Sequence, residues 1–294
     1  MELKLIKAVW GMDETWPERF RKIAEAGYQG LETPMPAPED EAVFRELQEQ
    51  YKLDLVIQVY SGLEEHRHSL SGKVHYLSLE EQVERARTFQ PILINSQSAK
   101  DAMPYEEQLY YFEKAIALEK KIGIPISHET HRGRATFTPW TTARLLKDLP
   151  DLRIAADFSH WCNVCESILP DQEQNLRLAI ERSIHIHGRV GFEHGPQVPD
   201  YRAPEYAYAL AAHERWWDAI IAEHLKRGEK YLTFTPEFGP PGYMHTQPYT
   251  QMPVVDLWEI CFAMGQHFKA RFNAFLESSA ARESVIDPHG TVRK

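Results

Sequence analysis

Four short segments of the sequence place metal-binding types of residue at the end of an apolar run. The first follows the apolar stretch 122–126 and reads His-Glu-Thr-His; the four segments span residues 128–131, 155–160, 184–189 and 234–240. Carboxylates and imidazoles together suit a hard or borderline divalent ion. One such segment is a weak signal, but four that repeat the pattern predict that their ends meet at one site.

The alternation of side chains along a strand selects one residue from each segment. Successive residues of a strand point to opposite faces, so Glu129 shares a face with His131, and His187 shares one with His185. We expect one divalent metal ion at this site, Mn²⁺, Mg²⁺ or Co²⁺, with Zn²⁺ as a further option. Its predicted ligands are Glu129, Asp157, His187 and Glu237. The alternative is that these buried carboxylates pair with arginine.

A metal ion held by these residues predicts proton-transfer chemistry. It would leave positions open for two adjacent substrate oxygens, polarise a carbonyl and stabilise the enediolate that forms when a neighbouring C–H proton leaves. Glu129 and Glu237 are the candidate catalytic acid and base. The candidate substrate-binding residues are His160, Arg189, Trp10, Gln58 and Asn95. For Arg189 the alternative is an ion pair with Glu237 or Asp157, and for His160 a supporting role.

The elements that must position these residues alternate regularly along the chain. Short apolar runs predict strands at 3–9, 30–33, 53–60, 92–96, 124–129, 152–157, 184–189 and 231–237, and longer patterns predict helices at 17–26, 39–51, 79–89, 105–122, 139–146, 170–182, 206–227 and 254–276. Eight successive βα units without a linker favour an α/β fold with a single (β/α)8 TIM barrel over residues 1–277, followed by a polar C-terminal tail at 278–294. In such a barrel the working residues lie at the carboxyl ends of the strands, where all four segments fall.

Composition narrows the class of partner. The 294 residues carry a formal net charge of −10, which makes a nucleic-acid partner less expected than a small polyhydroxy substrate. Three cysteines favour a reducing compartment over a disulfide framework, and no apolar run approaches the roughly 18 residues that span a bilayer. We therefore expect a cytoplasmic protein that binds neither membrane nor nucleic acid. The long loop 191–204 is expected to be a lid or an arm of a homo-oligomer.

The four segments resemble the metal-site motifs of the xylose isomerase-like TIM barrels, the sugar phosphate isomerase/epimerase superfamily, in order and spacing over residues 1 to about 275. In the ketose 3-epimerases of that superfamily a glutamate, an aspartate, a histidine and a glutamate bind the metal, and the two glutamates move the proton. Glu129, Asp157, His187 and Glu237 match these positions, and His160 matches a histidine that binds substrate oxygens. Ala135 and Arg189 stand where those epimerases carry carboxylates.

The resemblance and the residues lead to one principal hypothesis and several alternatives. The principal one is a divalent-metal-dependent isomerase or epimerase of a small sugar, sugar acid or sugar phosphate, acting through a metal-bound enediolate. A metal-dependent dehydratase or lyase of an inosose- or dehydroshikimate-like substrate would begin with the same proton loss. An apurinic-site endonuclease and a non-catalytic binding barrel are further alternatives.

Overall fold

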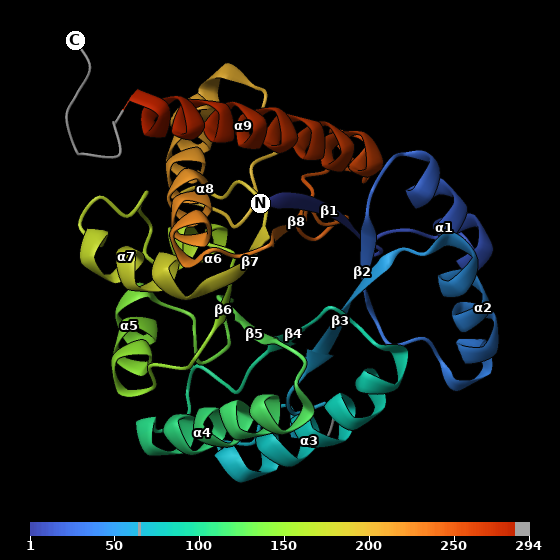
Figure 1. Ribbon diagram of the computed structural model, residues 1–294, viewed down its shortest axis with the longest axis vertical. Helices are drawn as coiled ribbons and strands as arrows, with labels where there is room; N and C mark the ends of the chain where they lie inside the picture. The colour runs from blue at the N-terminus through green and yellow to red at the C-terminus, as the bar shows by residue number, and fades with distance from the viewer. Residues whose placement is uncertain (64–65, 286–294) are drawn as a thin grey trace.

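The structure, a computed structural model, describes residues 1–63 and 66–285. Eight parallel strands close into a barrel in chain order, and β8 pairs with β1 (Figure 1). The strands are β1 (Glu2–Ala8), β2 (Gly30–Pro34), β3 (Asp54–Tyr60), β4 (Leu93–Gln97), β5 (Ile126–Glu129), β6 (Ile154–Ala156), β7 (Ser183–His187) and β8 (Tyr231–Thr235). The predicted single (β/α)8 barrel is confirmed.

Helices cover the outside of the barrel (Figure 1). They are α1 (Trp16–Glu25), α2 (Glu41–Tyr51), α3 (Gly72–Ala86), α4 (Tyr105–Ile122), α5 (Pro139–Asp148), α6 (Ser159–Val164), α7 (Glu173–Arg182), α8 (Ala207–Arg227) and α9 (Leu257–Val285), with 3-10 turns η1 (Pro38–Asp40), η3 (Arg87–Phe89) and η4 (Pro204–Tyr206). Within the described residues, no helix has both the length and the apolar character needed to cross a membrane.

Three helices differ from the sequence prediction for physical reasons. Helix α3 begins at Gly72 rather than at residue 79, because its first turns bury polar side chains: His75 bonds to the Ser61 hydroxyl at 3.0 Å, and Ser78 accepts a backbone bond at 3.2 Å. An apolar pattern cannot detect such turns. The sequence did not predict helix α6, because its six residues are too few to display a helical period.

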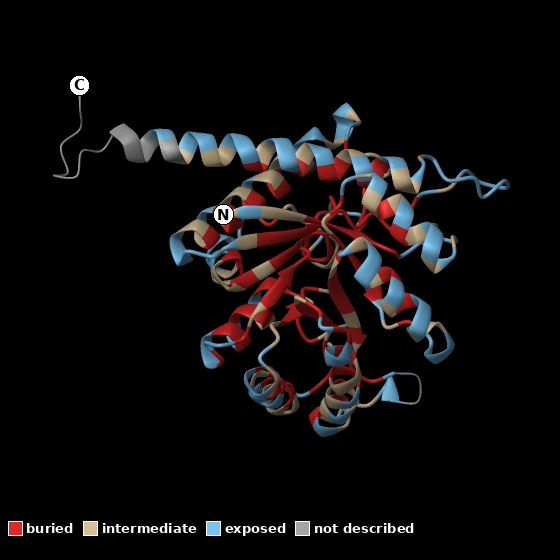
Figure 2. Ribbon diagram, turned by 45° about the vertical axis from the view of Figure 1, so that its right-hand side comes forward, coloured by how far each residue is buried: buried red, intermediate tan, exposed pale blue. Residues whose placement is uncertain are grey.

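The last helix is longer than predicted. Helix α9 ends at Val285 instead of residue 276, so the start of the expected polar tail, 278–285, is helical. This stretch contains good helix formers but no apolar stripe. Figure 2 shows α9 lying along the outside of the barrel, with exposed residues along its outer side. The remainder of the predicted tail, 286–294, lies outside the described residues.

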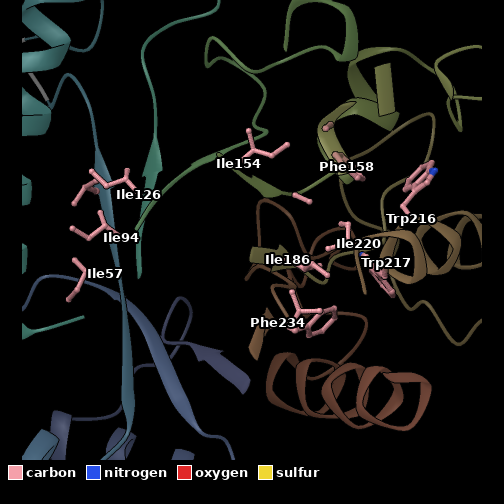
Figure 3. Close-up of a cluster of buried hydrophobic side chains, with 14 of the residues drawn as sticks. Ile57, Ile94, Ile126, Ile154, Phe158, Ile186, Trp216, Trp217, Ile220 and Phe234 are labelled. Carbon is pink, nitrogen blue, oxygen red and sulfur yellow. The ribbon is translucent and has the colours of Figure 1, made fainter. Parts of the chain in front are cut away.

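The strands divide their side chains between two environments. Outward-facing Ile57, Ile94, Ile126, Ile186 and Phe234 pack against the surrounding helices (Figure 3). Inside the barrel, Ile6, Val56 and Leu93 form a small separate apolar cluster. Along β3 the residues that share the inward face with Val56 are polar, so the apolar plug gives way to a polar interior toward the carboxyl ends of the strands.

The loop 191–204 packs onto the barrel. Val198 and Tyr201 are buried, and the side chain of Gln197 accepts a bond from Gly239 N at 2.7 Å and donates to Gly239 O at 3.4 Å. These bonds attach the middle of the loop to the segment that follows β8, so this part of the loop is packed in place.

A buried histidine anchors the start of this loop. His213 of α8 accepts a bond from Gly191 N at 3.3 Å, and its Nδ1 donates to the Ala209 carbonyl at 2.9 Å. Since Nε2 must accept and Nδ1 must donate, only the neutral ring satisfies both partners. Burial accordingly lowers the pKa of His213 from 6.5 to about 4.

Acidification should therefore destabilise the protein through His213. The unfolded histidine gains a proton near pH 6.5 and the folded one only near pH 4, so this contribution to stability is complete above pH 6.5 and falls by about 1.4 kcal/mol per pH unit below it. Urea unfolding of the EDTA-treated protein at pH 7, 6 and 5 should show a shallower pH dependence for His213→Gln than for the wild type. Identical slopes would contradict this assignment.

Candidate metal centre

The four residues assigned as metal ligands meet at the carboxyl end of the barrel. Glu129 and His187 are the last residues of β5 and β7, Asp157 directly follows β6, and Glu237 lies two residues past β8. All four are buried, and one ligand atom from each lies within 4.8 Å of the others. The barrel thus brings together every residue of the predicted tetrad, whose role in metal binding remains a prediction.

His187 lies at the centre of this cluster. Its Nδ1 atom is 2.8 Å from Glu237 Oε2, 3.6 Å from Glu129 Oε1 and 4.0 Å from Asp157 Oδ2. The opposite ring nitrogen, Nε2, is 3.1 Å from Glu32 Oε1. A histidine held by a carboxylate through one nitrogen presents the other to a metal in a fixed orientation.

Two observations test whether these residues fit a divalent ion. Glu129 Oε2 is buried and has no hydrogen-bond partner, and His187 Nδ1 makes no well-aligned hydrogen bond although Glu237 Oε2 lies 2.8 Å away, which is costly unless another group binds these atoms. In addition, four buried carboxylates gather here: Glu32, Glu129, Asp157 and Glu237. Among the described residues, Arg189 is the one arginine or lysine within ion-pair distance of any of them. The excess negative charge and the free ligand atoms fit a divalent cation.

The electrostatics of the cluster agree with this interpretation. Burial alone would lower the pKa of His187, but the carboxylates of Glu237, Glu32 and Glu129 raise it well above its usual value. Burial likewise opposes ionisation of Glu129, and the neighbouring His187 nevertheless lowers the pKa of Glu129 to about 2. The carboxylates therefore attract positive charge to Nδ1, where a proton and a metal ion compete.

Arg189 is ion-paired with Asp157, one of the two roles left open by the sequence. Its Nη2 contacts Asp157 Oδ2, lies 3.5 Å from Glu237 Oε2 and bonds to His160 Nε2 at 2.9 Å. The hydroxyl of Ser159 bonds to the other oxygen of Asp157. Burial still dominates, and it raises the pKa of Asp157 to about 6 despite the arginine. Both carboxylate oxygens of Asp157 therefore already have protein partners.

Gly188 permits the chain just after β7 to pack closely against Phe234 of β8. A Cβ atom at this position would lie 2.0 Å from Cζ of Phe234, a buried ring that stacks on Phe268 with centroids 3.7 Å apart. Any larger residue would push the end of β7 away from β8, and so move His187 relative to Glu237.

Sequence reasoning missed Glu32, which organises the layer beneath the tetrad. This β2 carboxylate is 1% exposed and contacts His187, His185 at 3.2 Å and the Thr235 hydroxyl at 2.6 Å. Burial would raise the pKa of Glu32, but His187 and His185 hold it well below its usual value. A charged residue inside a four-residue predicted strand was the signal available in the sequence.

Two predicted substrate-binding residues have structural partners instead of facing the cavity. Asn95 is 1% exposed, and its amide donates to Glu32 at 3.0 Å and lies 3.2 Å from His187 Nε2, so it supports the tetrad from below. His160 is fully buried beneath His131, whose ring centroid is 3.9 Å away. Neither side chain lines the cavity at the barrel mouth.

A cavity of about 490 Å³ opens above the tetrad. Glu129, Glu237 and Arg189 line its floor, and the predicted substrate-binding residues Trp10 and Gln58 also line it. Tyr243, which the sequence did not single out, closes one side: it packs edge-on against Trp10 with ring centroids 5.1 Å apart and lies 4.8 Å from the Arg189 guanidinium. The cavity is large enough for a small ligand.

Comparison with known proteins gives similarity at the level of the fold. No protein-family model and no curated protein sequence matches the chain. Among solved structures, a xylose isomerase-like TIM barrel protein from Mycobacterium smegmatis in complex with magnesium is 13% identical, with a TM-score of 0.59 over 93% of this chain and 98% of that one. A sugar phosphate isomerase/epimerase from Parabacteroides distasonis is 11% identical, with a TM-score of 0.58 over 94% and 96%.

Proteins with other activities share the same architecture. The probable 3-DHS dehydratase AsbF from Bacillus anthracis is 15% identical, with a TM-score of 0.55 over 91% of this chain and 99% of that one. An AP endonuclease of family 2 from Brucella melitensis is 16% identical, with a TM-score of 0.57 over 82% and 94%. The chain therefore has the fold of the xylose isomerase-like TIM barrels, as its motifs predicted.

Proposed function

We propose that the protein is a divalent-metal-dependent isomerase or epimerase of a small sugar, sugar acid or sugar phosphate. The observation that carries the proposal is the arrangement of two ionisable carboxylates, Glu129 and Glu237, on the floor of one cavity beside Nδ1 of His187. The magnesium complex and the sugar phosphate isomerase/epimerase among proteins of the same fold support the choice of chemistry.

The tetrad and its supports suit proton transfer next to a carbonyl. A divalent cation held by Glu129, Asp157, His187 and Glu237 would supply Lewis-acid polarisation of a substrate carbonyl. Glu129 lines the cavity and its Oε2 has no hydrogen-bond partner, so this oxygen is placed to take up the proton of a neighbouring C–H group. Glu237 reaches the cavity from another strand and can exchange a proton at a second position.

The cavity wall supplies orientation and aromatic surface. The amide of Gln58 donates to Glu32 at 3.2 Å and to Glu237 at 3.4 Å, and the Tyr60 hydroxyl bonds to Gln58 at 3.3 Å. These bonds hold the Glu237 carboxylate in place from the side of β3. Trp10 and Tyr243 offer aromatic faces, which suit the C–H faces of a sugar ring.

Deuterium exchange tests this function directly. The full-length protein with Mg²⁺ or Mn²⁺ in D₂O should incorporate deuterium from solvent at the carbon next to the carbonyl of its substrate, in an NMR screen of ketoses, sugar acids and sugar phosphates. The EDTA-treated protein serves as the control and should show no exchange. Formation of a new C=C signal would assign the protein to the dehydratases, and the absence of any exchange over the whole screen would contradict the proposal.

A further inference from the structure

One wall of the cavity carries a cation, Arg19, that forms no ion pair with any described residue, and we propose that it binds an anionic group of the substrate. The group is a carboxylate or a phosphate located away from the reacting carbons. The proposal rests on the proposed function, because it concerns the same cavity, and it narrows the substrate to a sugar acid or a sugar phosphate.

The charges that line the cavity are separated in space along the fold. The acids, Glu129 and Glu237, come from the ends of β5 and β8, whereas Arg19 belongs to α1, which follows β1. The loops after β1 and β2 contribute mainly apolar residues to the wall, including Trp16 and Met35, and no aspartate or glutamate. A ligand that fills the cavity would therefore meet an acidic floor at one end and a cation at the other.

The cation at this end of the cavity has no acid within ion-pair distance among the described residues. Arg189, the other arginine of the lining, is paired with Asp157, but Arg19 makes no ion pair with any described residue. Glu14, an acid on the preceding loop, bonds instead to Lys22 at 2.7 Å. The Nε atom of Arg19 is buried without a hydrogen-bond partner. Arg19 lines the cavity, and its Nη1 makes no hydrogen bond with a described residue, so this terminal N–H group is suited to an oxyanion.

The guanidinium is also held in a defined position. Its Nη2 donates to the Met12 carbonyl, and its Cζ atom lies over the Trp16 ring, 4.9 Å from the ring centroid. Trp16 is fixed in turn, because its indole N–H donates to Asp40 at 3.2 Å and its ring packs edge-on against the buried Phe44 at 4.9 Å. A preorganised cation beside apolar side chains loses little entropy on binding and competes with less water.

Matched polyols that differ in one terminal group test the proposal. Glucitol is neutral, gluconate carries a carboxylate and glucitol 6-phosphate carries a phosphate; none has an aldehyde or ketone group, so binding can be measured without turnover. Isothermal titration of the full-length protein in Mg²⁺ buffer should give at least one of the anionic polyols an affinity about tenfold or more above that of glucitol, as expected for a charge-assisted hydrogen bond. Which anion is preferred distinguishes the carboxylate from the phosphate.

Variants of α1 assign the effect to Arg19. Arg19→Met should remove the preference for the anionic polyol and leave glucitol binding unchanged, Arg19→Lys should retain part of it, and Arg21→Met, at an exposed position of the same helix, should behave as the wild type. Equal affinity for all three polyols, no binding of either anionic polyol, or a preference that survives in Arg19→Met would overturn the proposal. Deuterium exchange by the wild-type protein would be unaffected by these results, so the proposed function would still stand.

Discussion

Replacement of Glu237 by glutamine is expected to abolish turnover and to weaken metal binding strongly. The substitution keeps the size of the side chain but removes a carboxylate that lies 2.8 Å from His187 Nδ1 and lines the cavity floor. Loss of one positioned acid or base alone costs a factor of about 10² to 10⁴ in rate. Because Glu237 would also be a metal ligand, we expect the observed loss at the upper end of that range or beyond it.

The measurement is turnover of the substrate found in the deuterium screen, together with the Mn²⁺ content of the purified variant. Glu205→Gln is a suitable control, since Glu205 is exposed and distant in sequence from every ligand. A thermal melt close to that of the wild type would show that the Glu237→Gln protein is folded. Wild-type turnover and wild-type Mn²⁺ content in this variant would contradict the assignment of Glu237 to the site.

Replacement of Glu32 by alanine is expected to damage both the metal site and the stability of the barrel. Glu32 holds His187 Nε2 at 3.1 Å and also contacts His185 and Thr235, all of them buried. A group that orients a metal-binding histidine typically contributes about 10- to 100-fold to metal affinity. Removal of one member of a buried ionic network costs about 3–5 kcal/mol, because its partners lose their hydrogen bonds in a place that water does not reach.

Glu32→Gln provides the matched comparison, since the amide keeps the shape and some of the hydrogen bonds. The urea midpoint should fall in the order wild type, Glu32→Gln, Glu32→Ala, and Mn²⁺ affinity should follow the same order. If Glu32→Ala matched the wild type in both measurements, the layer beneath the tetrad would have no part in metal binding.

The sequence predicted those features that depend on regular periodicity. Alternating apolar runs and helical patterns placed all eight strands, and the rule that strand side chains alternate placed Glu129, His187 and Gln58 inside the barrel. The ends of adjacent parallel strands must meet, so the convergence of the tetrad followed from the fold itself. Helix boundaries were predicted less well wherever polar side chains were buried, as in the first turns of α3.

Depth along the barrel could not be predicted from the sequence. Asn95 and Gln58 both point inward, but Asn95 lies beneath His187 and is fully engaged, whereas Gln58 reaches the cavity. Tyr243 comes from the irregular segment between β8 and α9, and its place beside Trp10 results from tertiary packing that leaves no periodic trace. The choice of Asp157 as the partner of Arg189 likewise depended on distances that only the folded chain sets.

The central claim is that the ends of four strands hold one divalent cation, and direct titration of the metal-free protein with Mn²⁺ tests it. The full-length wild-type protein, stripped with EDTA, should bind one Mn²⁺ ion per chain, and Glu129→Gln should lose that binding because it removes a buried carboxylate whose Oε2 has no protein partner. Absence of a saturable site in the wild type, or equal binding by Glu129→Gln, would contradict the account.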